Sequence, residues 1–197
     1  MTQRRIYQVI LPYFITTNIE ERFWFFDNEK YAQLLYQIII EAGRIKGFNL
    51  YAFCILPDHL HLLVKNGGRA LEKARCGTEG ETFFCFASHG FYPYIRRESS
   101  SLPQRGLFPE KQRGLSSPRG YTISDLMQSI KGNFSRQIHV AELWQSRYNF
   151  RIIDNEKRLY NILQYIKYNY EKHGLPGKYS RYPHLYLNNE LINELFF

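Results

Sequence analysis

The stretch NLYAFCILPDHLHLLVK, residues 49–65, decides the fold. Its first part, Asn49–Leu56, is an apolar run that ends at Pro57-Asp58, a pair typical of tight turns. Its second part, His59–Lys65, is again rich in apolar residues and follows the turn directly. Two such runs separated by two turn residues predict a β-hairpin.

The second strand of this hairpin carries two histidines on one face. Because successive strand side chains point to opposite faces, His59, His61 and Leu63 share one face. The two imidazoles are then one pleat repeat apart, close enough to share a cation. A hard ion such as Mg²⁺ or Mn²⁺ would need oxygen ligands as well. Histidines that only hydrogen-bond to their neighbours give the same pattern, so the pair alone does not assign a metal site. The opposite face of the strand carries Leu60, Leu62 and Val64.

A strand and a helix are predicted before the hairpin. Ile6–Phe14 has apolar residues on both alternating faces, which predicts a central strand. After a loop rich in aromatic residues, Asp27 or Asn28 can cap an amphipathic helix that ends at Gly47.

Beyond residue 120 the pattern predicts a helix, a short strand and a second helix. Ser124 can cap the first helix, and Phe150–Ile153 has the composition of the strand. Asp154 can cap the last helix, which runs to His173 with Gly174 at its end. The apolar stripe of the first of these helices is Leu126, Ile130, Phe134 and Ile138.

The resulting order of elements is β, α, β, β, α, β, α. It predicts an α+β fold, a ferredoxin-like sandwich whose antiparallel sheet has helices on one face and an extra C-terminal helix on the other. We expect residues 1–197 to form one domain. The segment 67–120 is rich in Gly and Pro and repeats Gln-Arg-Gly-Leu at 104–107 and 112–115, which indicates an insertion or long loop.

The composition favours a nucleic-acid partner. Lys and Arg total 26 against 18 Asp and Glu, giving a net charge of +8, and the chain has 16 Tyr and 15 Phe. Basic charge with planar side chains suits phosphates and unstacked bases. An ordinary basic protein with an aromatic core has the same composition, so charge nominates nucleic acid without proving it.

The cysteines indicate a reducing compartment. Cys54, Cys76 and Cys85 are odd in number, and none belongs to a Cys-x-x-Cys motif. No apolar stretch is long enough to span a bilayer, and Met1–Arg5 is not followed by a signal-peptide pattern. We therefore expect a cytoplasmic, nucleoid-associated protein that does not contact membranes.

A tyrosine and an asparagine four residues apart on the last helix are candidates for chemistry. Tyr165 and Asn169 lie on one helix face with Cβ atoms about 6 Å apart. A phenol is a poor nucleophile near neutral pH, and a cation that polarises a scissile phosphate lowers the demand on it. Tyr160, Tyr168 and Tyr170 crowd the same helix, so spacing alone does not choose the nucleophile.

These motifs together resemble the HUH single-tyrosine transposases. The stretch LPDHLHLLV at 56–64 resembles their His-hydrophobe-His signature, and QYIKYN at 164–169 with HGL at 173–175 resembles their nucleophile helix. The likeness is greatest to the group associated with repetitive extragenic palindromes. It covers most of the chain outside 67–120 and includes the stretch before the nucleophile helix, namely Trp144-Gln145, Tyr148 and 151–153.

The resemblance implies a function and a site. His59 and His61 would be ligands of Mg²⁺ or Mn²⁺, Asn169 would complete the metal site, and Tyr165 would be the nucleophile. The enzyme would cleave and rejoin single-stranded DNA through a 5′-phosphotyrosine intermediate, recognise hairpin or palindromic DNA, need no nucleotide cofactor and work as a possible homodimer. The chain departs from the group in its long insertion and in having Tyr170 where proline is usual.

Two alternatives remain open at this point. One is a hairpin DNA- or RNA-binding module derived from a transposase that no longer cuts. The other is a replication initiator or relaxase with the same histidine motif, although those chains are usually longer. For either activity, the candidates for contact with DNA phosphates are Arg4, Arg5, Lys131, Arg136, Arg147, Arg151, Lys167 and Lys172.

Overall fold

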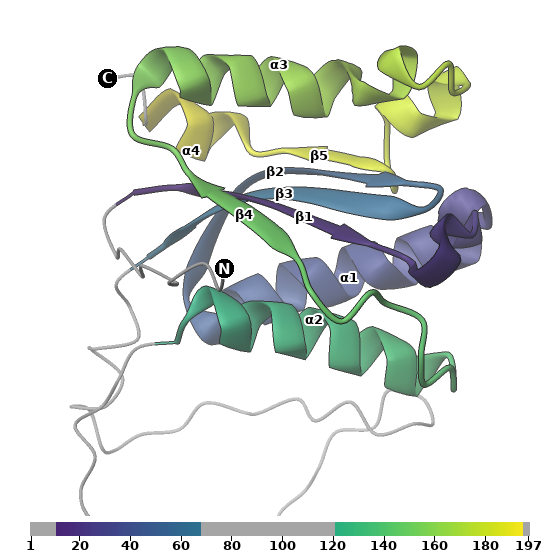
Figure 1. Cartoon of the computed structure of the whole chain (residues 1–197). Helices are drawn as coiled ribbons and strands as arrows, with labels where there is room; N and C mark the ends of the chain where they lie inside the picture. The colour runs from purple at the N-terminus through teal and green to yellow at the C-terminus, as the bar shows by residue number, and fades with distance from the viewer. Residues whose placement is uncertain (1–10, 68–120, 195–197) are drawn as a thin grey trace, which may run out of the picture.

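An antiparallel sheet lies between two layers of helices (Figure 1). The computed structural model describes residues 11–67 and 121–194. In this part of the chain the sheet has five strands in the order β4-β1-β3-β2-β5. The strands are β1 (Tyr13–Asn18), β2 (Phe48–Leu56), β3 (His59–Asn66), β4 (Asn149–Ile152) and β5 (Leu185–Leu187). The helices are α1 (Glu29–Lys46), α2 (Ile123–Gln137), α3 (Glu156–Lys172) and α4 (Asn189–Glu194), with 3₁₀ turns η1 (Glu20–Arg22), η2 (Phe25–Asp27) and η3 (Gly177–Ser180).

The topology confirms the predicted ferredoxin-like sandwich. Strands β1 and β2 are both antiparallel to β3, which lies between them, and they are connected through α1. The chain then passes through α2 to β4, which pairs with the outer side of β1. Helices α1 and α2 cover one face of the sheet, while α3 and α4 lie on the other (Figure 1). The predicted extra helix on the opposite face is therefore present as α3.

Each face of the sheet has its own hydrophobic core. The side chains of Leu60, Leu62 and Val64 pack in the cluster beneath α1 and α2, whereas Leu63 packs in the cluster beneath α3. This is the predicted alternation of β3. Burying a Leu or Val side chain stabilises the fold by roughly 1.5–3 kcal/mol, so a one-residue slip of β3 would be strongly unfavourable. The register of the histidines is fixed in this way.

Helix α1 begins and ends as predicted. The Asn28 side chain accepts a hydrogen bond from the Lys30 backbone N–H at 3.1 Å. The helix stops at Gly47, whose φ of 69° lies in the left-handed region that glycine adopts without strain.

The predicted cap of α2 is wrong. Thr122, not Ser124, is the N-cap, and it forms a reciprocal capping box with Asp125. A capping box needs an acidic or amide side chain three residues after the cap. Thr122 finds one in Asp125, whereas the residue three positions after Ser124 is Met127.

The cap of α3 is also displaced by one residue. The Asn155 side chain accepts from the backbone N–H of Arg158 at 2.9 Å, which makes Asn155 the N-cap. The predicted cap, Asp154, instead binds the guanidinium of Arg158. The preceding strand β4 is Asn149–Ile152, one residue earlier than the predicted range.

The first strand differs most from its prediction. Of the predicted range, residues 6–10 lie outside the described residues, and β1 begins only at Tyr13. Pro12 has no N–H to donate to a neighbouring strand and only accepts, from the Ile153 N–H at 2.9 Å, so regular pairing begins at Tyr13. The strand continues beyond the predicted end at Phe14, through Thr16 and Thr17 to Asn18. Its interior place between β4 and β3 agrees with the predicted central strand.

The sequence pattern did not predict the C-terminal elements β5 and α4. Strand β5 has three residues and pairs with β2 at the edge of the sheet, and α4 has six. Segments this short contain too few residues for a recognisable periodicity. Among the described residues, no helix combines the length and apolar character needed to cross a membrane.

The Asp27 carboxylate joins η2 to η3, and its contacts predict a pH-dependent stability. The Asp27 carboxylate accepts hydrogen bonds from Lys178 Nζ at 2.5 Å and from Tyr179 Oη at 2.6 Å. Both bonds lower the pKa of Asp27, and the bond from Lys178 has the larger effect. A lowered folded-state pKa gives stability that is present above the unfolded-state pKa and is lost as the pH falls through the folded value.

We expect Asp27→Asn to lower the free energy of unfolding by about 0.5–1 kcal/mol at pH 7, a small value because the carboxylate is half-exposed. Urea unfolding at descending pH should show the variant and the parent converge. Asp154→Asn is the control, since it removes only an exposed pair within one segment of the chain. A constant difference at all pH values would contradict the assignment.

Candidate active site

Two nearly buried imidazoles lie at the start of β3. The side chains of His59 and His61 are 5% and 4% exposed. Their ring centroids are 4.8 Å apart and the rings are almost perpendicular, at 86°. The hairpin register and the turn at Pro57-Asp58 thus place both rings on the α3 side of the sheet.

Both imidazoles are held through the same ring nitrogen. His59 Nδ1 is 2.5 Å from Asp58 Oδ1, and His61 Nδ1 is 2.8 Å from Thr16 Oγ1. The other oxygen of Asp58 accepts from Arg22 Nε at 2.8 Å, and a carboxylate paired with a guanidinium also accepts from the imidazole. A histidine that donates through Nδ1 presents the lone pair of Nε2. The ring of His59 is therefore oriented as metal ligands usually are, and Thr16 leaves the Nε2 of His61 facing Tyr165.

Burial keeps these imidazoles neutral. Desolvation lowers the pKa of His59, against an opposing effect of Asp58. Desolvation, helped by the neighbouring His59 and His173, lowers the pKa of His61 to about 3. Only the neutral form of an imidazole binds a metal, so no proton has to be displaced near neutral pH.

Helix α3 brings one phenol to the imidazoles. Tyr165 Oη is 3.4 Å from His61 Nε2, and the two ring centroids are 5.1 Å apart. The Phe14 ring stacks on His61 and meets Tyr165 edge-on, which limits the rotation of both side chains. Burial raises the pKa of Tyr165, and Lys172 Nζ lies 5.0 Å from its ring centroid.

The other tyrosines of α3 point elsewhere. Tyr160 and Tyr168 are 56% and 44% exposed, and the Tyr170 hydroxyl donates to the Glu171 carboxylate. Of the tyrosines on this helix, only Tyr165 has its hydroxyl at a histidine in the described part of the chain. The tertiary structure thus makes a choice that the spacing on the helix left open.

Asn169 contributes a buried oxygen that lacks a hydrogen-bond partner. Its side chain is 1% exposed, and its amide nitrogen makes a long contact of 3.9 Å with Cys54 Sγ. Its Oδ1 has no partner among the described residues. A buried carbonyl without a partner is costly and uncommon, and often marks a site where an ion or water binds.

This donor set fits a divalent ion. The residues 11–67 and 121–194 contain no group of three or more His, Cys, Asp or Glu side chains that could hold a metal, so two imidazoles alone would be incomplete. The orphan Asn169 oxygen lies one helical turn from Tyr165 and can supply a third ligand. Two imidazole nitrogens and an amide oxygen suit Mn²⁺. They can also bind Mg²⁺, although Mg²⁺ prefers oxygen ligands.

Three residues of this site were missed in the sequence. Asp58 was read only as a turn residue and Thr16 not at all, yet they orient the two imidazoles. His173 follows the last residue of α3, and its ring centroid is 5.4 Å from that of His59. The signal available for Asp58 was its position directly before His59; nothing in the sequence indicated the other two contacts.

The predicted DNA-binding residues do not form one surface. On α2, Lys131 is half-buried and donates to the Gln145 carbonyl at 2.8 Å, and burial lowers its pKa to about 8. It is thus engaged in the fold. Arg136 is exposed but lies on the same helix, on the face of the sheet opposite α3 (Figure 1). Lys131 and Arg136 are therefore separated from Tyr165 by the sheet.

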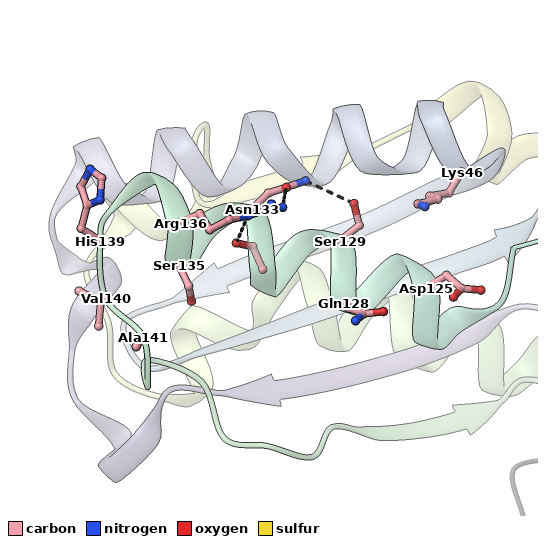
Figure 2. Close-up of a pocket in the computed structure, with 11 residues that line it drawn as sticks. Lys46, Asp125, Gln128, Ser129, Asn133, Ser135, Arg136, His139, Val140 and Ala141 are labelled. Atoms are coloured by element: carbon pink, nitrogen blue, oxygen red, sulfur yellow. Dashed lines mark hydrogen bonds between the residues drawn. The ribbon is translucent and has the colours of Figure 1, made fainter. Parts of the chain in front are cut away.

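Arg136 lines a hollow beside α2 (Figure 2). Its guanidinium bonds to Asn133 Oδ1 and to the Gly132 carbonyl. No member of the imidazole and phenol cluster lines this hollow. Its polar lining residues include Lys46, Asp125, Ser129, Asn133, Arg136 and His139.

Three of the remaining predicted contacts, Lys167, Lys172 and Arg151, lie on the side of the sheet that carries α3. Lys167 and Lys172 are exposed on α3, and Arg147 is exposed just before β4. Arg151 pairs with Phe14 across β4 and β1, and cross-strand partners share a face of the sheet, so Arg151 is on the side of Tyr165. Arg4 and Arg5 lie outside the described residues, as do Cys76, Cys85 and most of the predicted insertion at 67–120.

Comparisons with known proteins support the fold. No family model and no curated protein matches this sequence. Among solved structures, a REP-associated tyrosine transposase bound to a REP hairpin matches with a TM-score of 0.59 and 21% identity, over 99% of this chain and 87% of that one. A proposed transposase from Deinococcus radiodurans R1 matches with a TM-score of 0.40 and 19% identity, over 84% of this chain and 95% of that one. The first similarity shows that the two chains share a fold.

Proposed function

We propose that this protein is a metal-dependent transposase that cleaves and rejoins single-stranded DNA through a 5′-phosphotyrosine intermediate and recognises hairpin DNA. The observation that carries the proposal is the position of Tyr165 Oη, 3.4 Å from Nε2 of His61. The buried Asn169 oxygen that lacks a partner lies one turn farther along the same helix. The hairpin-bound transposase with the same fold supports the choice of substrate.

The metal ion would be held by Nε2 of His59, Nε2 of His61 and Oδ1 of Asn169. Bound there, Mg²⁺ or Mn²⁺ would supply Lewis acidity that polarises the scissile phosphodiester. The protein's own contribution is to hold the ligands in place before DNA arrives. Asp58 and Thr16 fix the two rings, and the surrounding core excludes water from them.

The reaction is a transesterification. Tyr165 Oη attacks phosphorus, a bond between that oxygen and phosphorus forms, and the bond from phosphorus to the 3′-oxygen breaks. The phenol releases its proton to water and the 3′-oxygen takes one up, so no nucleotide cofactor or redox partner is needed. The phosphotyrosine keeps the bond energy, and a later 3′-hydroxyl reverses the step.

The phosphate backbone would approach from the α3 side. Lys172, Lys167 and Arg151 lie on this side of the sheet and can contact phosphates that flank the scissile bond. Lys172 is the nearest of them to the nucleophile, at 5.0 Å from the Tyr165 ring. The proposal places the protein in the cytoplasm with the nucleoid, as a monomer or as a homodimer.

Single-stranded and hairpin oligonucleotides from the gene's own flanks test the function. They are incubated with the protein with EDTA, Mg²⁺ or Mn²⁺ and separated on denaturing gels. We expect a protein-DNA adduct with the 3′-side fragment only with metal, and a released 5′-side fragment that ends in a free 3′-hydroxyl. Hairpin binding without any adduct would instead identify a binding module that does not cut.

Asp58 provides a test of the metal site that does not depend on cleavage. A second residue that orients a ligating histidine typically contributes 10–100-fold to metal affinity. We expect Asp58→Asn, which keeps both ligands, to weaken Mn²⁺ binding by about this factor in calorimetry without DNA. Asp154→Asn, which alters an exposed pair at the far end of α3, should leave the affinity unchanged. Unaltered binding by Asp58→Asn would show that Asp58 does not contribute to a metal site through His59.

A further inference from the structure

An exposed aromatic pair lies in the loop that links β1 to α1. Phe23 and Trp24 are 67% and 61% exposed, whereas the next two residues, Phe25 and Phe26, pack against the core. Burying such a ring usually stabilises a protein, so leaving two adjacent rings in water is not explained by folding. We propose that Phe23 and Trp24 form a stacking platform for unpaired bases of the DNA strand that enters the candidate active site. This inference rests on the proposed function for the identity of the strand.

The loop is held firmly against the histidine hairpin. The Ile19 N–H donates to the Asp58 carbonyl at 2.8 Å, and the Phe26 N–H donates to the Pro57 carbonyl at 2.9 Å. These bonds lie on both sides of the aromatic pair. The pair therefore has a fixed place relative to the turn that precedes His59, and stacking on it would cost little ordering of the loop.

The backbone before the pair adopts a conformation that is uncommon for these residues. Glu21 and Arg22 have φ values of 53° and 57°, in the left-handed region. Such strain persists where the surroundings enforce it, often at functional sites. Here it directs the chain outward at Phe23 while Arg22 turns back to Asp58.

Arg22 connects the platform to the site. Its Nε is 2.8 Å from the Asp58 carboxylate, which holds His59 through the other oxygen. The loop, the β2–β3 turn and the C-terminal end of α3 lie at the same end of the sheet (Figure 1). A strand with its scissile phosphate at Tyr165 would thus have its neighbouring nucleotides near the platform.

The charges around the pair favour bases over phosphates or an anionic surface. Glu20 and Glu21 directly precede Arg22 and are exposed, so they repel a phosphate backbone or an anionic membrane. Bases are uncharged, and every base has a planar face that can stack on Phe or Trp. Carboxylates can also accept from exocyclic amines of bases. DNA bases therefore fit the Phe23 and Trp24 pair best, with the phosphate backbone of the DNA turned toward Lys172.

The fluorescence of Trp24 can report whether DNA binds at this pair. The chain has two tryptophans, and Trp144 packs between Phe26 and Phe134 in the core. In a Trp144→Phe variant Trp24 is the sole tryptophan. Titration in EDTA with a hairpin oligonucleotide that carries a single-stranded flank should quench its fluorescence and reduce quenching by iodide. Iodide quenching that DNA leaves unchanged would overturn the proposal.

Abasic substitution tests the stacking contact itself. In anisotropy titrations we expect Phe23→Ala/Trp24→Ala to weaken binding of the normal oligonucleotide by about tenfold or more. One flank position made abasic should weaken binding to the parent protein equally and abolish the difference between parent and variant. Tyr160→Ala, which removes a similarly exposed aromatic ring from α3, is the control. A variant defect of equal size on every abasic oligonucleotide would exclude stacking.

Two further outcomes distinguish base stacking from contact between copies of the chain and from the proposed catalysis. If the alanine variant changes the molar mass in light scattering and not the DNA affinity, the pair is an interface between copies of the chain and the proposal is wrong. If the platform binds bases but Tyr165 forms no adduct with any metal, the proposed function fails while the stacking contact is supported.

Discussion

Tyr165→Phe is expected to abolish the metal-dependent protein-DNA adduct, with a rate of formation at least about 10³-fold below that of the parent. The substitution removes one oxygen atom and keeps the ring that packs on Phe14 and faces His61. The fold and DNA affinity should therefore be unchanged. Denaturing gels with end-labelled DNA measure the adduct, and anisotropy measures binding.

No other tyrosine of α3 is placed to replace it. Tyr168 is exposed, and Tyr170 is bonded to Glu171. Tyr168→Phe is the matched control, because it removes a phenol three residues away on the same helix and should leave adduct formation intact. Equal adduct levels in Tyr165→Phe and the parent, or loss of adduct only in Tyr168→Phe, would show that the nucleophile is another residue.

Asn169→Leu is expected to stabilise the metal-free protein while it removes the response to metal. Leucine has the same branching and number of side-chain heavy atoms as asparagine and removes the buried Oδ1 that has no partner in the described structure. Removing an unsatisfied buried acceptor should raise the free energy of unfolding by about 1–3 kcal/mol. Loss of the weak contact with Cys54 reduces this gain. For a chain of this length that corresponds to a rise in melting temperature of about 2–4 °C per kcal/mol.

The same variant should lose the metal site. The parent should melt at a higher temperature with Mn²⁺, because an ion that binds only the folded state stabilises it. Asn169→Leu should show no such rise and form no adduct. A substitution that raises stability and removes function is expected at a residue whose role is chemical and not structural.

An asparagine elsewhere on α3 is the control for these measurements. Asn161 is exposed, so Asn161→Leu should change the free energy of unfolding by less than about 0.5 kcal/mol and leave the Mn²⁺ response intact. A destabilised Asn169→Leu that still binds Mn²⁺ with parental affinity would show that the amide is a packing residue and not a ligand.

Local patterns predicted those parts of the fold that depend on neighbours in sequence. The hairpin at Pro57-Asp58, the start of α1 at Asn28 and its end at Gly47 all follow from a few adjacent residues. The first strand was misplaced because its prediction followed the apolar run, which ends at Phe14, whereas β1 continues through Thr16 and Thr17. In the fold, Thr16 bonds to an imidazole and Thr17 is buried, both through contacts with distant segments.

The choice among the tyrosines of α3 needed long-range contacts, because four of them share the helix. The cap of α2 did not, since the capping box of Thr122 with Asp125 is local. Strand β5 is too short to predict and exists because β2 offers an edge to pair with. Such decisions depend on which groups the rest of the chain brings close.

By itself the sequence determined the strand and helix periods. These put His59 beside His61 on one face, and Tyr165 beside Asn169 on another, since each pair lies within one element whose geometry is fixed by its backbone. Only the tertiary structure decided that the two pairs meet, that the hydroxyl of Tyr165 lies at His61, and that the predicted cations divide between two faces of the sheet. The physical reason is that these contacts join residues about a hundred positions apart, and packing of α3 on the second hydrophobic core, not local conformation, brings them together.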